Sequence, residues 1–255
     1  MIHLVTADVP APHGPHEQHR AGRAAAADAL RRSGSTKLEV GRRPDGAPVF
    51  PAGFAGSIAH TPRLAVAAVC RAEEARGVGV DLETDTVQER LHRILLREEE
   101  RESLWVPADE PTLRRLFVAK EAAFKAFSAC EEPVARTFWR IRLEQAAPGA
   151  GRLLARAGDE RAWVRVWADS ERAWAVAVLL RPEQTSANRP VQAGHVDALG
   201  RKGLLDLGDH QLAVEPPVGQ QVDIGETELG PGVDREVGGG QQQHPRDGPI
   251  GEDVG

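Results

Sequence analysis

Hydrophobic and polar positions follow two different spacings along residues 1–182. Short apolar runs of strand length alternate with longer stretches in which apolar residues recur every three or four positions. Residues 41–56 are rich in glycine and proline and predict a loop. The pattern as a whole predicts strands over residues 2–7, 64–70, 78–83, 152–157, 162–167 and 173–180, and helices over 21–32, 89–103 and 112–128.

The order of these elements indicates two α+β halves. A strand, a helix and further strands come first, and helices followed by strands come second. We therefore expect an α+β fold in which residues 1–84 form one half and residues 85–182 a similar second half, with the joint near residues 84–88.

Residues 183–255 have a different composition. All five tryptophans and all six phenylalanines precede them, and residues 185–255 hold 14 of the 26 glycines. The same stretch carries 5 basic and 12 acidic side chains, which accounts for the net charge of −6. Such a segment buries too little apolar surface to offset its ordering entropy, so we expect a disordered, acidic, glycine-rich tail.

Composition excludes several classes of protein. Hydrophobic residues make up 41% and charged residues 27%, as in soluble globular domains. No apolar run approaches the ~20 residues of a membrane span, and no basic-then-apolar leader opens the chain. The two cysteines, Cys70 and Cys130, are far apart, so we expect a reduced, cytoplasmic protein without a disulfide scaffold or zinc ribbon. The charge distribution also lacks the basic footprint of a nucleic-acid binder.

Two carboxylates lie on one face of a predicted strand. In Val-Gly-Val-Asp-Leu-Glu, residues 78–83, alternation puts the aliphatic side chains on one face and Asp81 and Glu83 on the other. Such a pair can converge on a hard cation such as Mg²⁺. The same pattern also suits a solvated strand end, so both interpretations stay open.

A predicted helix carries a second group of charges. Glu121 and Lys125 are one turn apart, close enough to act on one ligand or to form a surface ion pair. The chain has 28 arginines and only four lysines, and Lys120 and Lys125 both fall in this helix. Because Arg and Lys are not interchangeable where a compact ammonium meets a phosphate, this usage favours a site that requires lysine.

A glycine-containing segment precedes both groups. In Gly-Phe-Ala-Gly-Ser-Ile-Ala-His-Thr, residues 53–61, glycines allow close approach to a ligand while Ser57 and His60 supply polar groups. A phosphate-binding loop and a plain loop-to-strand turn both fit. The Gly-x-Ser-x-Gly elbow of a serine hydrolase is absent. We expect His13, His16 and His19, spaced by three, to lie in a polar connector.

The order and spacing of these motifs resemble the 4′-phosphopantetheinyl transferase superfamily. The similarity rests on Gly-Ser-x-x-His at residues 56–60, Gly-Val-Asp-x-Glu at 79–83 and Lys-Glu-x-x-x-Lys at 120–125. Within that superfamily the chain looks most like the long, pseudo-dimeric, enterobactin-synthetase component type. The resemblance covers roughly residues 17–182. An aromatic residue usual before Gly22-Arg23 is absent here, which leaves phosphate contacts from Arg20 and Arg23 open.

The resemblance implies a function and a set of site residues. The halves would be related by a pseudo-two-fold axis, and the phosphopantetheine of coenzyme A would pass to a serine of an apo carrier protein, releasing 3′,5′-ADP. It implies Mg²⁺ on Asp81, Glu83 and Glu121, with Glu121 and Lys125 catalytic. It implies coenzyme A on residues Arg43, Gly46, Pro48, Ser57, His60 and Lys125.

The same resemblance frames the partner and the alternatives. We expect a monomer that modifies an acyl or peptidyl carrier domain, in siderophore or other secondary-metabolite synthesis. Two alternatives stay open. The chain could be a catalytically idle module that binds coenzyme A or a carrier protein, or it could be a Mg²⁺-dependent phosphohydrolase.

Overall fold

A computed structural model describes residues 1–129, 137–146 and 151–181, together with the backbone of residues 204–206 and 211–215. All of these belong to one compact unit, Met1–Gln220. The second unit, Gln221–Gly255, lies outside the described residues. Residues 204–206 and 211–215 are strands of the first sheet, which differs from the disorder expected over residues 183–255. The rest of that stretch lies outside the described residues.

The first sheet is covered by one helix. Its strand order is β11-β12-β1-β5-β4, in which β12 joins β1 in parallel and the other pairs are antiparallel. Val5, Ala67 and Val69 face α1, whose alanines and Leu30 pack against them. The strands are β1 (Ile2–Asp8), β4 (Phe54–His60), β5 (Leu64–Arg71), β11 (Leu204–Asp206) and β12 (Gln211–Glu215), and the helix is α1 (Pro15–Arg32).

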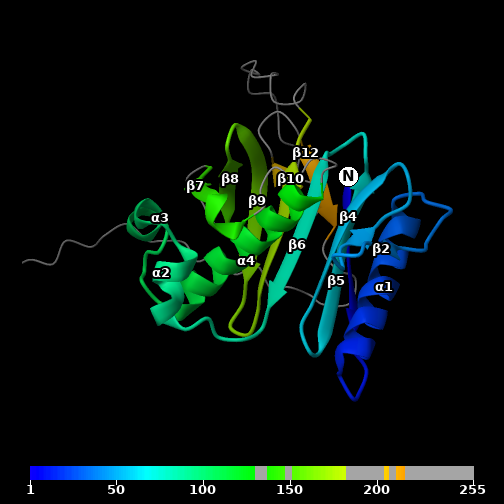
Figure 1. Cartoon of the computed structure of the whole chain (residues 1–255), viewed down its shortest axis with the longest axis horizontal. Helices are drawn as coiled ribbons and strands as arrows, with labels where there is room; N and C mark the ends of the chain where they lie inside the picture. The colour runs from blue at the N-terminus through cyan, green and yellow to red at the C-terminus, as the bar shows by residue number, and fades with distance from the viewer. Residues whose placement is uncertain (130–136, 147–150, 182–203, 207–210, 216–255) are drawn as a thin grey trace, which may run out of the picture. The chain divides into compact units, whose positions relative to one another are not determined.

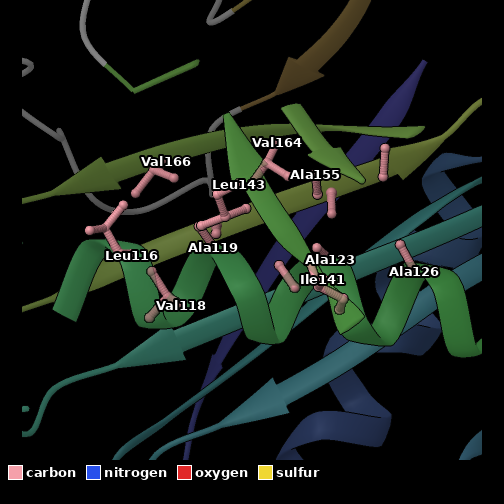
Figure 2. Packing of buried hydrophobic residues seen from close by; sticks show 14 of the residues in the cluster. Leu116, Val118, Ala119, Ala123, Ala126, Ile141, Leu143, Ala155, Val164 and Val166 are labelled. Carbon is pink, nitrogen blue, oxygen red and sulfur yellow. The ribbon is translucent and has the colours of Figure 1, made fainter. Parts of the chain in front are cut away.

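The second sheet is antiparallel and carries the other long helix. Its order is β6-β10-β9-β8-β7, and α4 (Glu110–Ser128) packs along one face. Figure 2 shows Leu116 and Ala119 of α4 turned toward Val164 and Val166 of β9. The strands are β6 (Gly77–Glu83), β7 (Arg142–Gln145), β8 (Arg152–Ala157), β9 (Glu160–Ala168) and β10 (Ala173–Leu179).

A third core lies between the two sheets. Ile2, Val66 and Cys70 of the first sheet pack with Val80 and Val176 of the second. The helices α1 and α4 therefore cover the outer faces of a two-sheet sandwich, as Figure 1 shows with α1 in blue and α4 in green. This mixed architecture confirms the expected α+β class. The pseudo-two-fold relation between halves stays a prediction.

Short elements complete the described part of the chain. They are β2 (Gly41–Arg42) and β3 (Pro48–Val49), which form a small hairpin, the 3₁₀ turns η1 (Glu89–Leu91) and η2 (Phe138–Arg140), and the helices α2 (His92–Leu95) and α3 (Glu98–Ser103). None of the helices in the described ranges is long and apolar enough to cross a membrane.

Several sequence expectations differ from the structure. Strand β4 begins at Phe54, inside the loop expected over residues 41–56, and the expected helix 89–103 is divided into η1, α2 and α3. α1 begins at Pro15 rather than residue 21, because proline fits the first helical turn, where its missing N–H costs nothing. His16 and His19 therefore lie on a helix and not in a connector.

The strand that carries the paired carboxylates belongs to the second sheet. We assigned residues 78–83 to the first half, but β6 pairs with β10 along its whole length. The predicted alternation is confirmed, since Val78, Val80 and Leu82 are buried between the sheets. The opposite face of β6 meets α4.

Gly79 sets the distance between β6 and α4. A Cβ at this position would lie 1.8 Å from the carbonyl oxygen of Ala122 and 2.7 Å from the backbone nitrogen of Ala126. Both are backbone atoms, so they cannot yield by a change of rotamer. The helix therefore lies directly on the strand, and this contact brings the charges of α4 to the carboxylates of β6.

We expect Gly79→Ala to destabilise the protein by about 1–3 kcal/mol or more, the usual range for overpacking, because the added methyl must push α4 from β6. Chemical denaturation measures this loss. Gly22→Ala is a milder comparison. Its Cβ would lie 2.8 Å from Ile58 Cγ2, which is a side-chain and not a backbone atom, and alanine has the higher helix propensity. Equal stability of Gly79→Ala and the parent protein would contradict the close approach.

Candidate active site

An ion pair joins β6 to α4 at the centre of the site. Asp81 is 6% exposed, and its Oδ1 accepts a hydrogen bond of 2.6 Å from the Lys125 ammonium. The same ammonium donates to the Val80 carbonyl over 3.1 Å. The structure thus brings together Asp81 and Lys125, which are 44 positions apart and were assigned to separate motifs.

Two more carboxylates lie in the electrostatic range of Asp81. Burial, followed by the nearby charges of Asp81 and Asp85, raises the pKa of Glu83 to about 7. Burial and the charge of Asp81 also raise the pKa of Glu121, while Lys125 lowers it. Asp81, Glu83 and Glu121 therefore form one coupled acidic group beside a single lysine.

The chemistry of this acidic group fits a hard cation. The second oxygen of Asp81, Oδ2, is buried without a hydrogen-bond partner, and mutual repulsion and burial disfavour the charged forms of the two glutamates. Carboxylate oxygens are the ligands that Mg²⁺ takes in proteins. Within the described ranges, however, no three His, Cys, Asp or Glu side chains are grouped closely enough to hold a metal ion as they stand.

Basic side chains from the first sheet also interact with Lys125 and with one another. Burial and the Lys125 ammonium lower the pKa of His60, which ends β4. Burial, Arg23, Arg42 and His60 together lower the pKa of His19 on α1. A basic group formed by His19, Arg23, Arg42, His60 and Lys125 therefore adjoins the acidic group, and its positive charge near pH 7 comes from the two arginines and the lysine. β4, which carries His60, lies against β6.

Arg23 holds the small hairpin against α1. Its Nη1 donates to the carbonyl oxygens of Val40 and, over 2.6 Å, of Gly41. Burial and the neighbouring Arg42 lower its pKa. The structure thus assigns Arg23 a structural contact and places Arg42, which the sequence analysis did not select, beside His19. Arg20 is exposed.

The other expected coenzyme A residues lie on the hairpin and on β4. Arg43 begins the hairpin turn, where its N–H donates to the Ala47 carbonyl over 2.8 Å and Gly46 adopts a positive φ of 91°. Pro48 pairs with Arg42 across the hairpin. Ser57 is buried within β4, three residues before His60. Their binding roles stay predictions.

Lys120 does not face this site. It is fully buried, and its ammonium donates to Glu100 Oε2 over 2.6 Å and to the Leu95 carbonyl over 2.9 Å. The two lysines of the helix thus have different surroundings. Only Lys125 lies where a bound anion could reach it.

Comparison with known proteins matches both sheets to one family. A model described as the 4′-phosphopantetheinyl transferase N-terminal domain matches residues 16–70, which run from α1 to β5. A model described as the 4′-phosphopantetheinyl transferase superfamily matches residues 77–179, which run from β6 to β10. The chain belongs to the 4′-phosphopantetheinyl transferase superfamily.

A curated relative gives the same indication. The 4′-phosphopantetheinyl transferase Npt of Nocardia iowensis is 34% identical over 103 residues, which are 39% of this chain and 46% of that protein. The match therefore spans less than half the length of the relative. The expected superfamily is confirmed, while the long, pseudo-dimeric, enterobactin-synthetase component type stays a prediction.

We expect the metal-free protein to lose stability as pH rises from about 4.5 to about 7. Over this interval folded Glu83 keeps a proton that the unfolded chain has released, so the free energy of unfolding falls with rising pH. Below the ordinary pKa of 4.5 the contribution is fully present and constant. The raised pKa of Glu121 acts in the same direction.

Urea unfolding across this pH range, with and without Mg²⁺, measures the effect. Glu83→Gln should reduce the pH slope, and added Mg²⁺ should reduce it in the parent protein, because both relieve the buried negative charge. A slope that Glu83→Gln leaves unchanged would show that another group causes it.

Proposed function

We propose that the chain transfers the 4′-phosphopantetheine group of coenzyme A to a serine of an apo carrier protein, depends on Mg²⁺, and releases 3′,5′-ADP. The observation that carries this proposal is the Lys125–Asp81 pair, which joins the acidic group to the basic group. A pyrophosphate bound with a divalent cation needs these two kinds of group next to each other.

Asp81, Glu83 and Glu121 are the residues that hold the metal in this proposal. The buried, unpartnered oxygen of Asp81 and the unfavourable charge of the two glutamates support that assignment. When bound, Mg²⁺ supplies positive charge to the pyrophosphate oxygens. The remaining steps belong to the side chains of the chain.

Glu121 acts as the general base. The serine hydroxyl of the carrier attacks the β-phosphorus of coenzyme A, its proton passes to the Glu121 carboxylate, and the phosphorus–oxygen bond to the leaving 3′,5′-ADP breaks. Burial raises the pKa of Glu121, which makes it a stronger base than an ordinary carboxylate. Glu121 lies on α4 one turn before Lys125, so the base and the ammonium contact neighbouring parts of the same bound coenzyme A.

Lys125 and His60 bind the leaving phosphate. Negative charge develops there as the bond breaks, and an ammonium stabilises it through a charge-assisted hydrogen bond. The lowered pKa of His60 keeps its ring neutral near pH 7, so it donates one hydrogen bond without adding a second full charge. Ser57 lies on the same strand and supports this part of the site.

The adenosine end of coenzyme A binds at the β2–β3 hairpin. Arg43, Gly46 and Pro48 supply the turn, Arg42 adds positive charge, and the neutral His19 ring offers a hydrogen bond next to His60. A polyanion can thus extend from Lys125 to the hairpin along one positively charged strip. This arrangement adds Arg42 to the residues expected from the sequence.

The finer classification belongs to the same proposal. We propose the long, pseudo-dimeric, enterobactin-synthetase component type, working as a cytoplasmic monomer on an acyl or peptidyl carrier domain of a secondary-metabolite pathway. The two family models on consecutive segments, one on each sheet, support the long type.

Mass spectrometry of carrier domains tests the function. The full chain is incubated with coenzyme A, Mg²⁺ and several apo carrier domains, and each carrier is weighed before and after. A mass gain equal to one phosphopantetheine, lost when the target serine is changed to alanine, supports the proposal. Release of phosphopantetheine without a carrier would instead indicate a phosphohydrolase, and coenzyme A binding without either product would indicate an idle binding module.

We expect Glu121→Gln to lower the transfer rate by about 10²–10⁴-fold, the usual contribution of a general base. Coenzyme A affinity should fall much less, because the amide keeps the shape of the side chain. Glu110→Gln, a neutralised glutamate in the first turn of the same helix, serves as the control and should transfer at the parent rate. Near-parent turnover of Glu121→Gln would remove Glu121 from the role of base.

We expect Arg42→Gln to raise the KM for coenzyme A about 10–100-fold while changing kcat little, because a charge-assisted contact to bound phosphate contributes roughly 1.5–3 kcal/mol. Steady-state kinetics at saturating carrier protein measure both constants. Arg63→Gln, at an exposed arginine of the β4–β5 turn, is the matched control. An unchanged KM in Arg42→Gln would exclude this arginine from the coenzyme A site.

A further inference from the structure

A buried ion pair lies on the side of α4 away from Asp81. Lys120 is 0% exposed and Glu100 of α3 is 1% exposed, and their charged atoms are 2.6 Å apart. Glu100 Oε2 also accepts from the Arg97 N–H over 2.7 Å, and Oε1 accepts from the Leu143 N–H over 2.6 Å. One carboxylate thus joins α3, α4 and β7.

The surroundings of the Lys120 ammonium prevent it from binding substrate. It donates to Glu100 and to the Leu95 carbonyl, and it lies 5.7 Å from the centre of the Phe138 ring. These groups enclose the ammonium, so a phosphate would have to displace the buried carboxylate to reach it.

Buried ion pairs are poor sources of net stability. Well-packed apolar side chains often stabilise a core as well as a buried pair does. What such a pair does provide is a defined geometry, because both charges must meet at hydrogen-bonding distance. Here the contact of Lys120 also sets the direction of Glu121, because the two residues are neighbours in the helix.

The two lysines hold α4 from different directions. Lys120 and Lys125 are five residues apart, so their side chains leave the helix about 140° from each other. One is held by Glu100 of α3 and the other by Asp81 of β6. Two such contacts, pointing in different directions, fix the rotation of α4 about its own axis.

We propose that Lys120 and Glu100 are positioning residues, whose buried contact fixes the rotation of α4 and so aims Glu121 at the acidic end of β6. The consequence for metal binding and transfer rests on the proposed function. The contact itself lies outside the site, and neither residue touches metal or substrate in this proposal.

Three variants of the full chain test the proposal. Glu100→Gln keeps an acceptor oxygen but loses the charge, and Lys120→Met keeps the aliphatic stem and loses the ammonium. Leu113→Ala is the control, since it shortens a fully buried α4 side chain outside the ion pair and should destabilise the protein without changing the rotation of the helix. Thermal unfolding measures whether each variant folds. If Lys120→Met does not fold, Glu100→Gln alone tests the proposal.

The main measurement is Mn²⁺ binding in the presence of coenzyme A, monitored through the electron paramagnetic resonance signal of free Mn²⁺. We expect Glu100→Gln and Lys120→Met to weaken Mn²⁺ binding by about 10–100-fold, the effect of losing a group that orients a metal ligand. Hydrogen exchange at the Leu143 amide should accelerate in both variants. Leu113→Ala should keep the parent Mn²⁺ affinity despite its lower unfolding midpoint.

The possible failures are distinguishable. The positioning role would be overturned if Mn²⁺ affinity fell in proportion to the unfolding midpoint in all three variants. It would also be overturned if Glu100→Gln kept the Mn²⁺ affinity of the parent protein. A KM for coenzyme A raised by Lys120→Met but not by Glu100→Gln would overturn it in favour of direct ligand contact. If the variants show the expected differences in Mn²⁺ affinity but the parent protein modifies no carrier domain, the proposed function is refuted and the positioning role stands.

Discussion

The missing side chain of Gly79 is the constraint on which the rest of the site depends. Because no Cβ stands between them, the backbone of α4 at Ala122 and Ala126 lies directly on β6. At that separation the Lys125 ammonium reaches both the Asp81 carboxylate and the Val80 carbonyl. A larger residue would separate the helix from the strand and leave Asp81 buried without its counterion, which is costly in a low-dielectric interior.

The electrostatic arrangement follows from that contact. Asp81 interacts with both kinds of charge, since its carboxylate raises the pKa values of Glu83 and Glu121 and pairs with Lys125, whose ammonium lowers the pKa of His60. Each group shifts the pKa values of its neighbours in the direction expected for like charges gathered in a partly buried place. Perturbed pKa values gathered in one place are typical of functional sites.

Much of this could be predicted from the sequence because it depends on local pattern. The alternation in β6 separates Asp81 from the buried valines, and the one-turn spacing in α4 puts Glu121 near Lys125. The start of β4 differs from the prediction, since glycines at 53 and 56 indicated a loop, whereas Gly56 lies within the strand, where the Phe50 ring packs against its backbone.

The remainder arises from contacts between distant segments. His19, Arg42 and His60 come from α1, the hairpin and β4, and only the fold brings them together. The Lys120–Glu100 contact likewise joins two helices whose charges, read along the chain, look like ordinary surface pairs. No local spacing in the sequence distinguishes a buried lysine of this kind from the accessible Lys125.

β6 also has a consequence for how the molecule unfolds. Its aliphatic side chains belong to the core between the sheets, while Gly79 and Asp81 on the alternate positions meet α4. A strand shared in this way leaves no cooperative boundary between the two cores. We therefore expect these two cores to open together, so that the carboxylates of β6 keep their arrangement until both cores are exposed.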